Sequence, residues 1–149
     1  MARIKKIIGR TDIVDLPEFG IKEIKVKIDT GAYTSAIHCS KIKTTIEDGE
    51  EYVTFHILNS HIKGTSKKRF KTNDFKQKNI KSSSGHIEKR YVIKTRILLF
   101  NKLINTEFSL TDRSQMKYPI LLGRKLLSKR FIVDVTSFNL SFKNKKHKL

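Results

Sequence analysis

The chain has 149 residues, 38% of them hydrophobic, and a formal net charge of +18 from 32 Lys and Arg against 14 Asp and Glu. This length suits one domain with a buried core and is short for two. No apolar run approaches the roughly 18 residues of a membrane span, no secretory leader is visible, and the lone Cys39 cannot form an internal disulfide, so we expect a cytoplasmic protein with no membrane partner.

Short alternating or apolar segments bounded by Gly, Asn, Asp and Ser recur along the chain, whereas helical periodicity is scarce. We therefore predict an all-β domain. In chain order, the predicted strands are 5–10, 21–29, 35–45, 52–58, 87–99, 104–110, 120–122, 130–134 and 139–142. The dipeptide Asp48-Gly49 favours a hairpin turn, Asn101-Lys102 is a weaker turn candidate, and 124–128 is the helix candidate.

A polar segment at about 59–84 separates two of these strands and has no apolar periodicity. We interpret it as a basic surface insertion in a domain that spans 1–142, followed by a basic tail at 143–149. Much of the excess charge lies in 63–81 and in this tail. Such a charge makes nucleic acid, the ribosome or an acidic protein segment candidate partners, although charge runs are usually solvated surface.

One carboxylate directly follows an alternating apolar run: Asp29 ends the stretch IKVKID and precedes Thr30, Gly31 and Ala32. Asp and Gly are common at strand ends for backbone reasons alone, so a routine turn is one interpretation. The other is a catalytic acid held on a tight loop.

Two later stretches favour the catalytic interpretation. One is the turn Ser82-Ser83-Ser84-Gly85 that leads into HIEKRYVIKT, and the other is YPILLGRKLL at 118–127. Taken in order, KIDTGAYTSAIH, SSSGHIEKRYVIKT and TDRSQMKYPILLGR resemble a bacterial family of retropepsin-like aspartic proteases, historically labelled "ATP-dependent zinc protease". With LPEFGIKEIKVKIDTG, the resemblance covers nearly the whole chain.

The resemblance implies a fold and a set of roles. The fold would be a closed β-barrel like a single lobe of pepsin, with one short C-terminal helix. Asp29 would be the catalytic residue, and Thr30 would hydrogen-bond across to a partner loop. Gly31 would let the backbone approach the carboxylate, because glycine has no Cβ. Ala32 would place only a small side chain beside the active site.

Two further segments receive supporting roles from the same resemblance. An apolar strand and the residues that follow it would pack beneath the Asp loop: Leu121, Leu122, Gly123 and Arg124. A flap, which is a mobile hairpin that closes over substrate, would contain Ser83, Ser84, Gly85 and His86. An ordinary polar turn is the alternative for these residues, and the hairpin at Asp48-Gly49 is the competing flap candidate.

The arginine of this pattern lacks its usual partner. In the viral relatives it pairs with an acidic residue shortly after Asp-Thr-Gly-Ala, but this chain has Tyr33 and Thr34 there. The sequence therefore leaves the partner of Arg124 open, with these acidic candidates: Asp112, Glu23 and Glu88.

Peptide hydrolysis without a metal or a covalent nucleophile needs a base for water and an acid for the carbonyl oxygen. Two close carboxylates that share one proton supply both, as the aspartic proteases illustrate. This chain has a single Asp-Thr-Gly loop, so we expect a homodimer in which each subunit contributes Asp29. The substrate would be a protein or peptide. Members of the resembled family often accompany an ATP-grasp ligase that adds glutamates to a ribosomal protein, and a cationic groove would suit such an acidic segment.

Other chemistries have less support, and no cofactor is expected. The five histidines and Cys39 form neither HExxH nor CxxC, so no metal site is predicted. No phosphate-binding GxxxxGK[ST] loop occurs, and nothing marks Cys39 as an activated nucleophile. The alternative function is a non-catalytic basic β-barrel adaptor that binds RNA, the ribosome or an acidic protein segment. Its candidate stacking residues, which could equally be core, are Phe55, Phe70, Phe75 and Tyr91.

Overall fold

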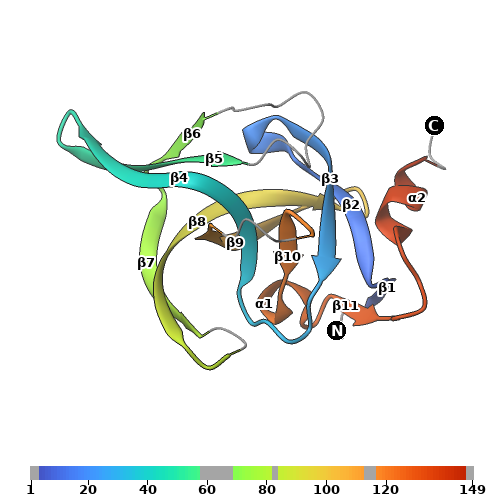
Figure 1. The fold of residues 1–149 in the computed structure, drawn as a ribbon. Helices are drawn as coiled ribbons and strands as arrows, with labels where there is room; N and C mark the ends of the chain where they lie inside the picture. Colours follow the sequence, from blue (N-terminus) through green and yellow to red (C-terminus); the bar gives the residue numbers. More distant parts are fainter. Residues whose placement is uncertain (1–3, 58–68, 82–83, 113–116, 147–149) are drawn as a thin grey trace.

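The fold was analysed in a computed structural model, which describes residues 4–57, 69–81, 84–112 and 117–146 (Figure 1). The all-β prediction is confirmed. In chain order the elements are β1 (Lys6–Ile8), β2 (Thr11–Leu16), the 3-10 turn η1 (Pro17–Phe19), β3 (Ile21–Ile28), β4 (Ser35–Glu47), β5 (Glu50–Ile57), β6 (Arg69–Thr72), β7 (Phe75–Lys81), β8 (Ile87–Leu99), β9 (Lys102–Thr111), β10 (Ile120–Leu122), α1 (Arg124–Leu127), β11 (Phe131–Val133) and α2 (Leu140–Lys146).

The main sheet closes into a ring. Its strands follow the order β10-β3-β2-β8-β9-β4, and β10 pairs a second time with β4. Ile120 of β10 therefore lies opposite Val26 of the parallel strand β3 and opposite Ile37 of the antiparallel strand β4. Because β10 lies between β3 and β4 and pairs with both, it provides hydrogen-bond partners for backbone groups at the edges of both strands.

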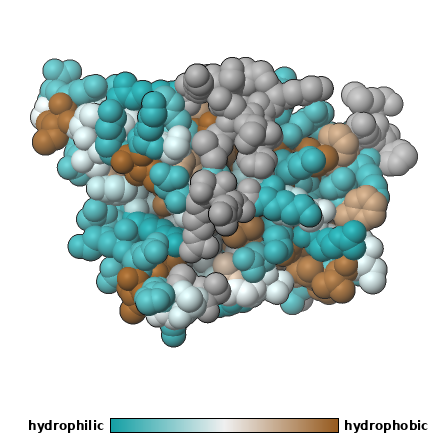
Figure 2. Space-filling view, in the orientation of Figure 1, coloured by the Kyte–Doolittle hydropathy of each residue, from teal (hydrophilic) through white to brown (hydrophobic). Residues whose placement is uncertain are grey.

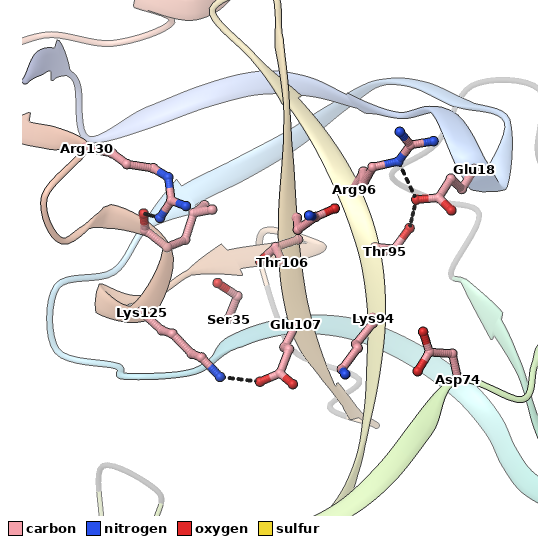
Figure 3. Close-up of a pocket in the computed structure, with 12 residues that line it drawn as sticks. Glu18, Ser35, Asp74, Lys94, Thr95, Arg96, Thr106, Glu107, Lys125 and Arg130 are labelled. Atoms are coloured by element: carbon pink, nitrogen blue, oxygen red, sulfur yellow. Dashed lines mark hydrogen bonds and ion pairs between the residues drawn. The ribbon is translucent and has the colours of Figure 1, made fainter. Parts of the chain in front are cut away.

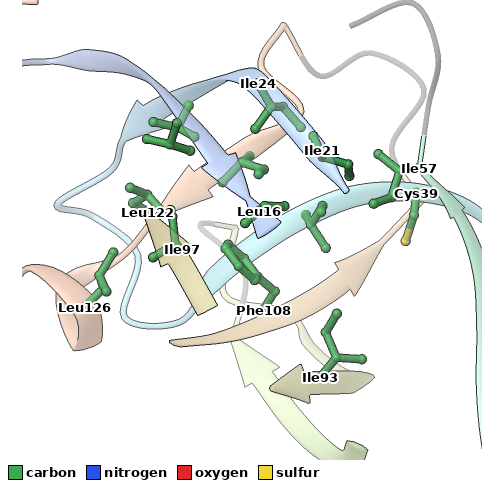
Figure 4. Close-up of a cluster of buried hydrophobic side chains, with 14 of the residues drawn as sticks. Leu16, Ile21, Ile24, Cys39, Ile57, Ile93, Ile97, Phe108, Leu122 and Leu126 are labelled. Atoms are coloured by element: carbon green, nitrogen blue, oxygen red, sulfur yellow. The ribbon is translucent and has the colours of Figure 1, made fainter. Parts of the chain in front are cut away.

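Apolar side chains from the strands of the ring fill its interior (Figure 4). In β3 the inward positions Ile24, Val26 and Ile28 are buried and alternate with exposed lysines, as the two-residue period of a strand requires. Phe108 of β9 and Leu122 of β10 are fully buried in the same cluster. Burial of each such side chain contributes about 1.5–3 kcal/mol, so the ring is held by a continuous core.

Both predicted hairpin turns occur, one of them shifted. Asp48 and Gly49 connect β4 to β5 with φ of 52° and 78°. The β8–β9 turn uses Phe100 and Asn101, with φ of 49° and 62°, so it begins one residue before the predicted Asn101-Lys102. Positive φ at both central residues is the geometry that matches the twist of two-residue hairpins.

Strands also occupy part of the segment interpreted as a loop-like insertion. β6 pairs with β5, and β7 pairs with β8 along its whole length. Residues 59–68 and 82–83 of that segment lie outside the described residues. β7 shows no apolar alternation because Lys76 and Lys78 make ion pairs instead of burying apolar groups. The sequence also gave no signal for β2, whose apolar run is interrupted by Asp12 and Asp15.

The strand predicted at 139–142 is wrong, because residues 140–146 form the helix α2, so α1 is not the one helix. The first residues of the segment interpreted as a basic tail lie in α2. Residues 140–146 are helical because of a residue that is distant in the sequence, Asp12. The buried carboxylate of Asp12 accepts hydrogen bonds from the backbone N–H groups of Ser141 (3.0 Å) and Phe142 (3.1 Å), and so caps the helix. Burial raises the pKa of Asp12, while these hydrogen bonds act in the opposite direction.

A small parallel sheet of β1 and β11 lies beside the ring. Ile7 and Ile132 are neighbours on it and remain about half exposed, at 45% and 52%. Figure 2 shows an apolar area at the lower right, where Figure 1 places these strands. The backbone N–H of Ile28 donates to the carbonyl of Arg10, just after β1, so this sheet adjoins the end of β3. No helix within the described ranges is long and apolar enough to cross a membrane.

Candidate active site

Asp29 begins a tight turn directly after β3. Its backbone N–H donates to the carbonyl of Leu122 in β10 (2.9 Å), and its own carbonyl accepts from Ala32 (3.2 Å). Within the turn, the N–H of Gly31 donates to the Asp29 carboxylate oxygen Oδ1 (3.0 Å). A Cβ at position 31 would lie 3.3 Å from that oxygen. The turn therefore holds a partly exposed carboxylate in one orientation.

The residues that follow β10 support this turn from beneath. The backbone N–H groups of Arg124 and Lys125 donate to the carbonyls of Ala32 (2.8 Å) and Tyr33 (2.9 Å). Gly123 passes so close that a Cβ there would lie 2.6 Å from the Tyr33 carbonyl oxygen. The apolar-Gly-Arg stretch and the Asp-Thr-Gly-Ala stretch, which are about 90 residues apart in the sequence, are thus brought into direct contact.

Arg124 has a different partner from the acidic candidates suggested by the sequence. Its Nη1 donates to the carbonyl of Thr30 (2.9 Å), and its guanidinium lies over the Tyr33 ring, 5.8 Å from the centroid. A backbone oxygen and an aromatic face therefore replace the expected ion pair. Of the candidates, Glu88 pairs with Arg90 at 2.9 Å.

A cavity of about 490 Å³ opens beside Asp29. The Asp29 turn and β10 form one side of it, and the hairpin of β7 and β8 forms another. The turn contributes Asp29, Gly31, Ala32, Tyr33 and Thr34, and Leu121 and Arg124 follow from the β10 segment. The other lining residues are Ala36 of β4, Asn79, Ile80 and Lys81 of β7, Arg90 of β8, and Ser109 and Thr111 of β9.

Positively charged side chains outnumber negatively charged ones in the lining of this cavity. Asp29 is the one carboxylate among the described residues that line it, whereas Lys81, Arg90 and Arg124 bring three cations. Arg90 is already engaged by Glu88, whose Oε2 accepts from Nε and Nη2. The cavity therefore offers a single acid next to a cationic rim, which suits an anionic ligand.

Three of the predicted flap residues, Ser84, Gly85 and His86, lie between β7 and β8. The two strands pair from Phe75 opposite Ile93 to Lys81 opposite Ile87, and the turn lies beyond them. Gly85 has φ of 88°, a value that favours glycine, and Ser84 and His86 are exposed like it. Ser83 lies outside the described residues. The competing hairpin at Asp48-Gly49 contributes no described residue to the cavity lining.

Sequence reasoning missed several lining residues. Those of β7 were hidden because the segment was interpreted as a surface excursion. Ser109 and Thr111 were detectable, since in the stretch EFSLT the polar residues alternate with Phe108 and Leu110 and must share one face of a strand.

The alternative site residues are placed elsewhere. Cys39 is buried, and burial raises the pKa of its thiol to about 12, so it is protonated at neutral pH. Within the described ranges, no group of three or more His, Cys, Asp or Glu is placed to hold a metal. Phe55 and Phe70 are buried and stacked on each other, so neither ring is open to a nucleic-acid base.

Comparisons with known proteins identify the family and the fold. A family model described as the retropepsin-like aspartic endopeptidase RimB matches residues 7–144. The chain is 39% identical over 87% of its length to a Desulfotalea psychrophila protein and 38% identical over 97% to a Shewanella halifaxensis protein, both named probable alpha-L-glutamate ligase. It spans only 28% and 32% of the lengths of those relatives. A crystal structure of a Legionella pneumophila protein of unknown function has the same fold, with a TM-score of 0.73, 23% identity, and coverage of 93% of this chain and 99% of that one.

Proposed function

Because the chain belongs to the RimB-like family of retropepsin-like aspartic endopeptidases, we propose that it hydrolyses peptide bonds with two Asp29 carboxylates, one from each subunit of a homodimer. The observation that supports this proposal most directly is that Asp29 is the one carboxylate among the described residues that line its cavity. General acid and general base must act in the same reaction, and one carboxylate cannot be protonated and ionised at once. A second copy of the chain supplies the missing group.

In this assembly the paired carboxylates share a proton, because two like charges a few ångströms apart do not both ionise easily. The ionised Asp29 takes a proton from water, and the protonated one donates to the peptide carbonyl oxygen. The Gly31 N–H, which donates to Oδ1, sets the orientation of each carboxylate. Thr30 is exposed beside it and is the residue proposed to contact the partner loop.

The β1–β11 sheet is the surface we assign to the second copy. Its exposed Ile7 and Ile132 provide the apolar contact that a strongly cationic chain needs to associate with itself. Arg10, two residues after β1, accepts a hydrogen bond from Ile28, the residue before Asp29, so the end of β1 lies near the Asp29 turn. Contact between two such sheets would therefore bring the two Asp29 turns towards each other.

The proposed substrate is an acidic peptide. Lys81 and Arg124 line the cavity and are exposed, so their charges attract carboxylates, whereas Arg90 is largely covered and paired with Glu88. The relatives named glutamate ligases support the same choice, because a protein that has received glutamates carries negative charge. The ligase activity in those names is not proposed for this chain, which spans about a third of their length.

The test is cleavage of a glutamate-rich peptide by the purified chain, followed by mass spectrometry. Asp29→Asn is expected to abolish cleavage without changing the dimer fraction, and EDTA is expected to leave the rate unchanged because no metal takes part. Asp48→Asn is the matched control, because it makes the same chemical change in an exposed turn where Asn tolerates positive φ. Equal cleavage by Asp29→Asn and wild type would refute the proposal.

The second candidate, a non-catalytic adaptor for RNA, the ribosome or an acidic protein segment, is favoured by the net charge of +18. Binding of this kind would weaken steeply with salt, because it depends on counterion release from a polyanion. Tight, salt-sensitive binding that Asp29→Asn leaves intact, in a protein that cleaves no peptide, would decide for the adaptor.

A further inference from the structure

Three lysines converge on one carboxylate beside α1. Glu107 of β9 pairs with Lys76 (3.0 Å) and Lys78 (3.1 Å) of β7, and with Lys125 of α1. Figure 3 shows Lys125 reaching across to Glu107. The Glu107 side chain is only 11% exposed, whereas the lysines are 33–46% exposed. The carboxylate is thus the least exposed member of a cluster that joins three elements.

Each of these elements also reaches the Asp29 cavity. On β7, Ile80 shares a face with Lys76 and Lys78 because side chains of a strand repeat every two residues, and Ile80 lines the cavity. On β9, Ser109 and Thr111 share the face of Glu107 and line it too. The Glu107 cluster therefore continues the surface on which the cavity is built.

The β7–β8 hairpin needs such an anchor. β7 pairs with β8 alone among the described strands, and β8 pairs with β9 only from Val92 onward. Residues 87–91 of β8 consequently have no described strand partner except β7. A two-stranded hairpin is marginally stable by itself, so side-chain contacts decide where it lies.

We propose that Glu107 is a positioning residue for the Asp29 site, which fixes the spacing between the hairpin and the Asp29 turn by holding Lys76, Lys78 and Lys125 together. Lys125 links Glu107 directly to the Asp29 turn, because its backbone N–H donates to the carbonyl of Tyr33 within that turn. The effect on catalysis rests on the proposed peptidase function. The anchoring of the hairpin does not.

The experiment compares wild type with Glu107→Gln, which keeps the shape of the side chain and removes its charge. Amide hydrogen exchange in β7 is expected to become about tenfold faster, while exchange in β2 and β3 stays unchanged. With a glutamate-rich peptide, KM should rise several-fold and kcat should change less than twofold, because a loosened hairpin weakens binding more than the chemistry. Glu107→Asp should restore part of both effects.

Glu18→Gln is the matched control. Glu18 pairs with Arg96 at 3.2 Å and lines the cavity of Figure 3, but it touches neither β7 nor α1 in the contacts described. If Glu107→Gln leaves β7 exchange unchanged, or Glu18→Gln speeds it equally, the positioning role is wrong, even if Asp29→Asn abolishes cleavage. If β7 exchange rises while wild type cleaves no peptide, the anchoring stands and the peptidase proposal fails.

Discussion

Two glycines near Asp29 act through different contacts. At Gly123 an added Cβ would lie 2.6 Å from one backbone carbonyl oxygen and 2.9 Å from another, so the backbone itself would have to move. At Gly31 the nearest atom to an added Cβ is the Asp29 carboxylate oxygen, at 3.3 Å. The first glycine is therefore needed for the fold of the site, and the second for the placement of the acid.

We expect Gly123→Ala to lower the free energy of unfolding by about 1–3 kcal/mol, the usual cost of overpacking. Gly31→Ala is expected to change stability by less than about 1 kcal/mol, because only one side-chain contact tightens, yet to reduce peptide cleavage strongly. Urea unfolding and initial rates measure the two effects. Equal losses of stability in the two variants would contradict this division.

Because of Glu107, we expect the free energy of unfolding to depend on pH in the acidic range. Burial raises its pKa, but hydrogen bonds from Lys125, Lys76 and Lys78 outweigh burial and hold the pKa at about 2, below the usual 4.5. A lowered pKa means that the stabilisation is complete above about pH 4.5 and is lost as the pH falls towards 2. Wild type should exceed Glu107→Gln by roughly 1–2 kcal/mol at neutral pH, after allowance for solvent around the lysines. In urea unfolding, the difference should shrink towards zero between pH 4.5 and 2.

Among the elements, α2 shows how a distant carboxylate can decide local structure. Besides the cap from Asp12, the Ser141 hydroxyl accepts from the Phe100 N–H (2.8 Å), and Lys145 pairs with Asp15 (2.6 Å). These contacts join α2 to β2 and to the β8–β9 turn. Polar contacts therefore tie down both the first turn of the C-terminal helix and its last turn.

Asp12→Ala is expected to cost about 1–2 kcal/mol, the usual value of a lost helix cap, and to loosen α2 before the ring opens. Amide exchange of residues 140–146 should accelerate while exchange in β3 stays slow. Asp12→Asn keeps one acceptor oxygen and should lose less. Unchanged exchange in α2 after Asp12→Ala would show that the helix does not depend on this cap.

The same elements explain what the sequence could and could not predict. β3, β8 and β10 were predictable because each buries its own alternating or apolar residues, and the residues of the Asp29 turn were marked by their order in the chain. α2 was mistaken for a strand because Leu140 and Phe142 alternate, while its cap lies 129 residues away. The Thr30 and Tyr33 contacts of Arg124 involve a carbonyl and a ring face, which a search for acidic partners does not consider.

For the whole molecule, net charge opposes the proposed homodimer. Two copies of a chain with a charge of +18 repel each other, and added salt screens that repulsion. The dimer should therefore tighten as salt rises, whereas binding to RNA should weaken. The sign of the salt effect thus separates self-association from polyanion binding.

Ile132→Asp is expected to shift the protein from dimer to monomer, because it places a charge in the apolar contact assigned to the second copy. Sedimentation velocity at about 50 mM and 500 mM NaCl measures the dimer fraction in the two screening regimes. Ile46→Asp is the control, since Ile46 is 74% exposed near the β4–β5 turn. A wild-type chain that stays monomeric at high concentration in both salts would contradict the shared site.

The position of β10 also has a consequence for biosynthesis. This strand holds the Asp29 turn through the carbonyl of Leu122, yet it is made some 90 residues after that turn. A growing polypeptide that has reached only residue 119 lacks β10. The backbone groups of β3 and β4 that pair with β10 are then without their partners, and Asp29 lacks its hydrogen bond to Leu122. Translation must pass residue 119 before the proposed active site can form, so a product that ends there would lack this site and be prone to aggregate.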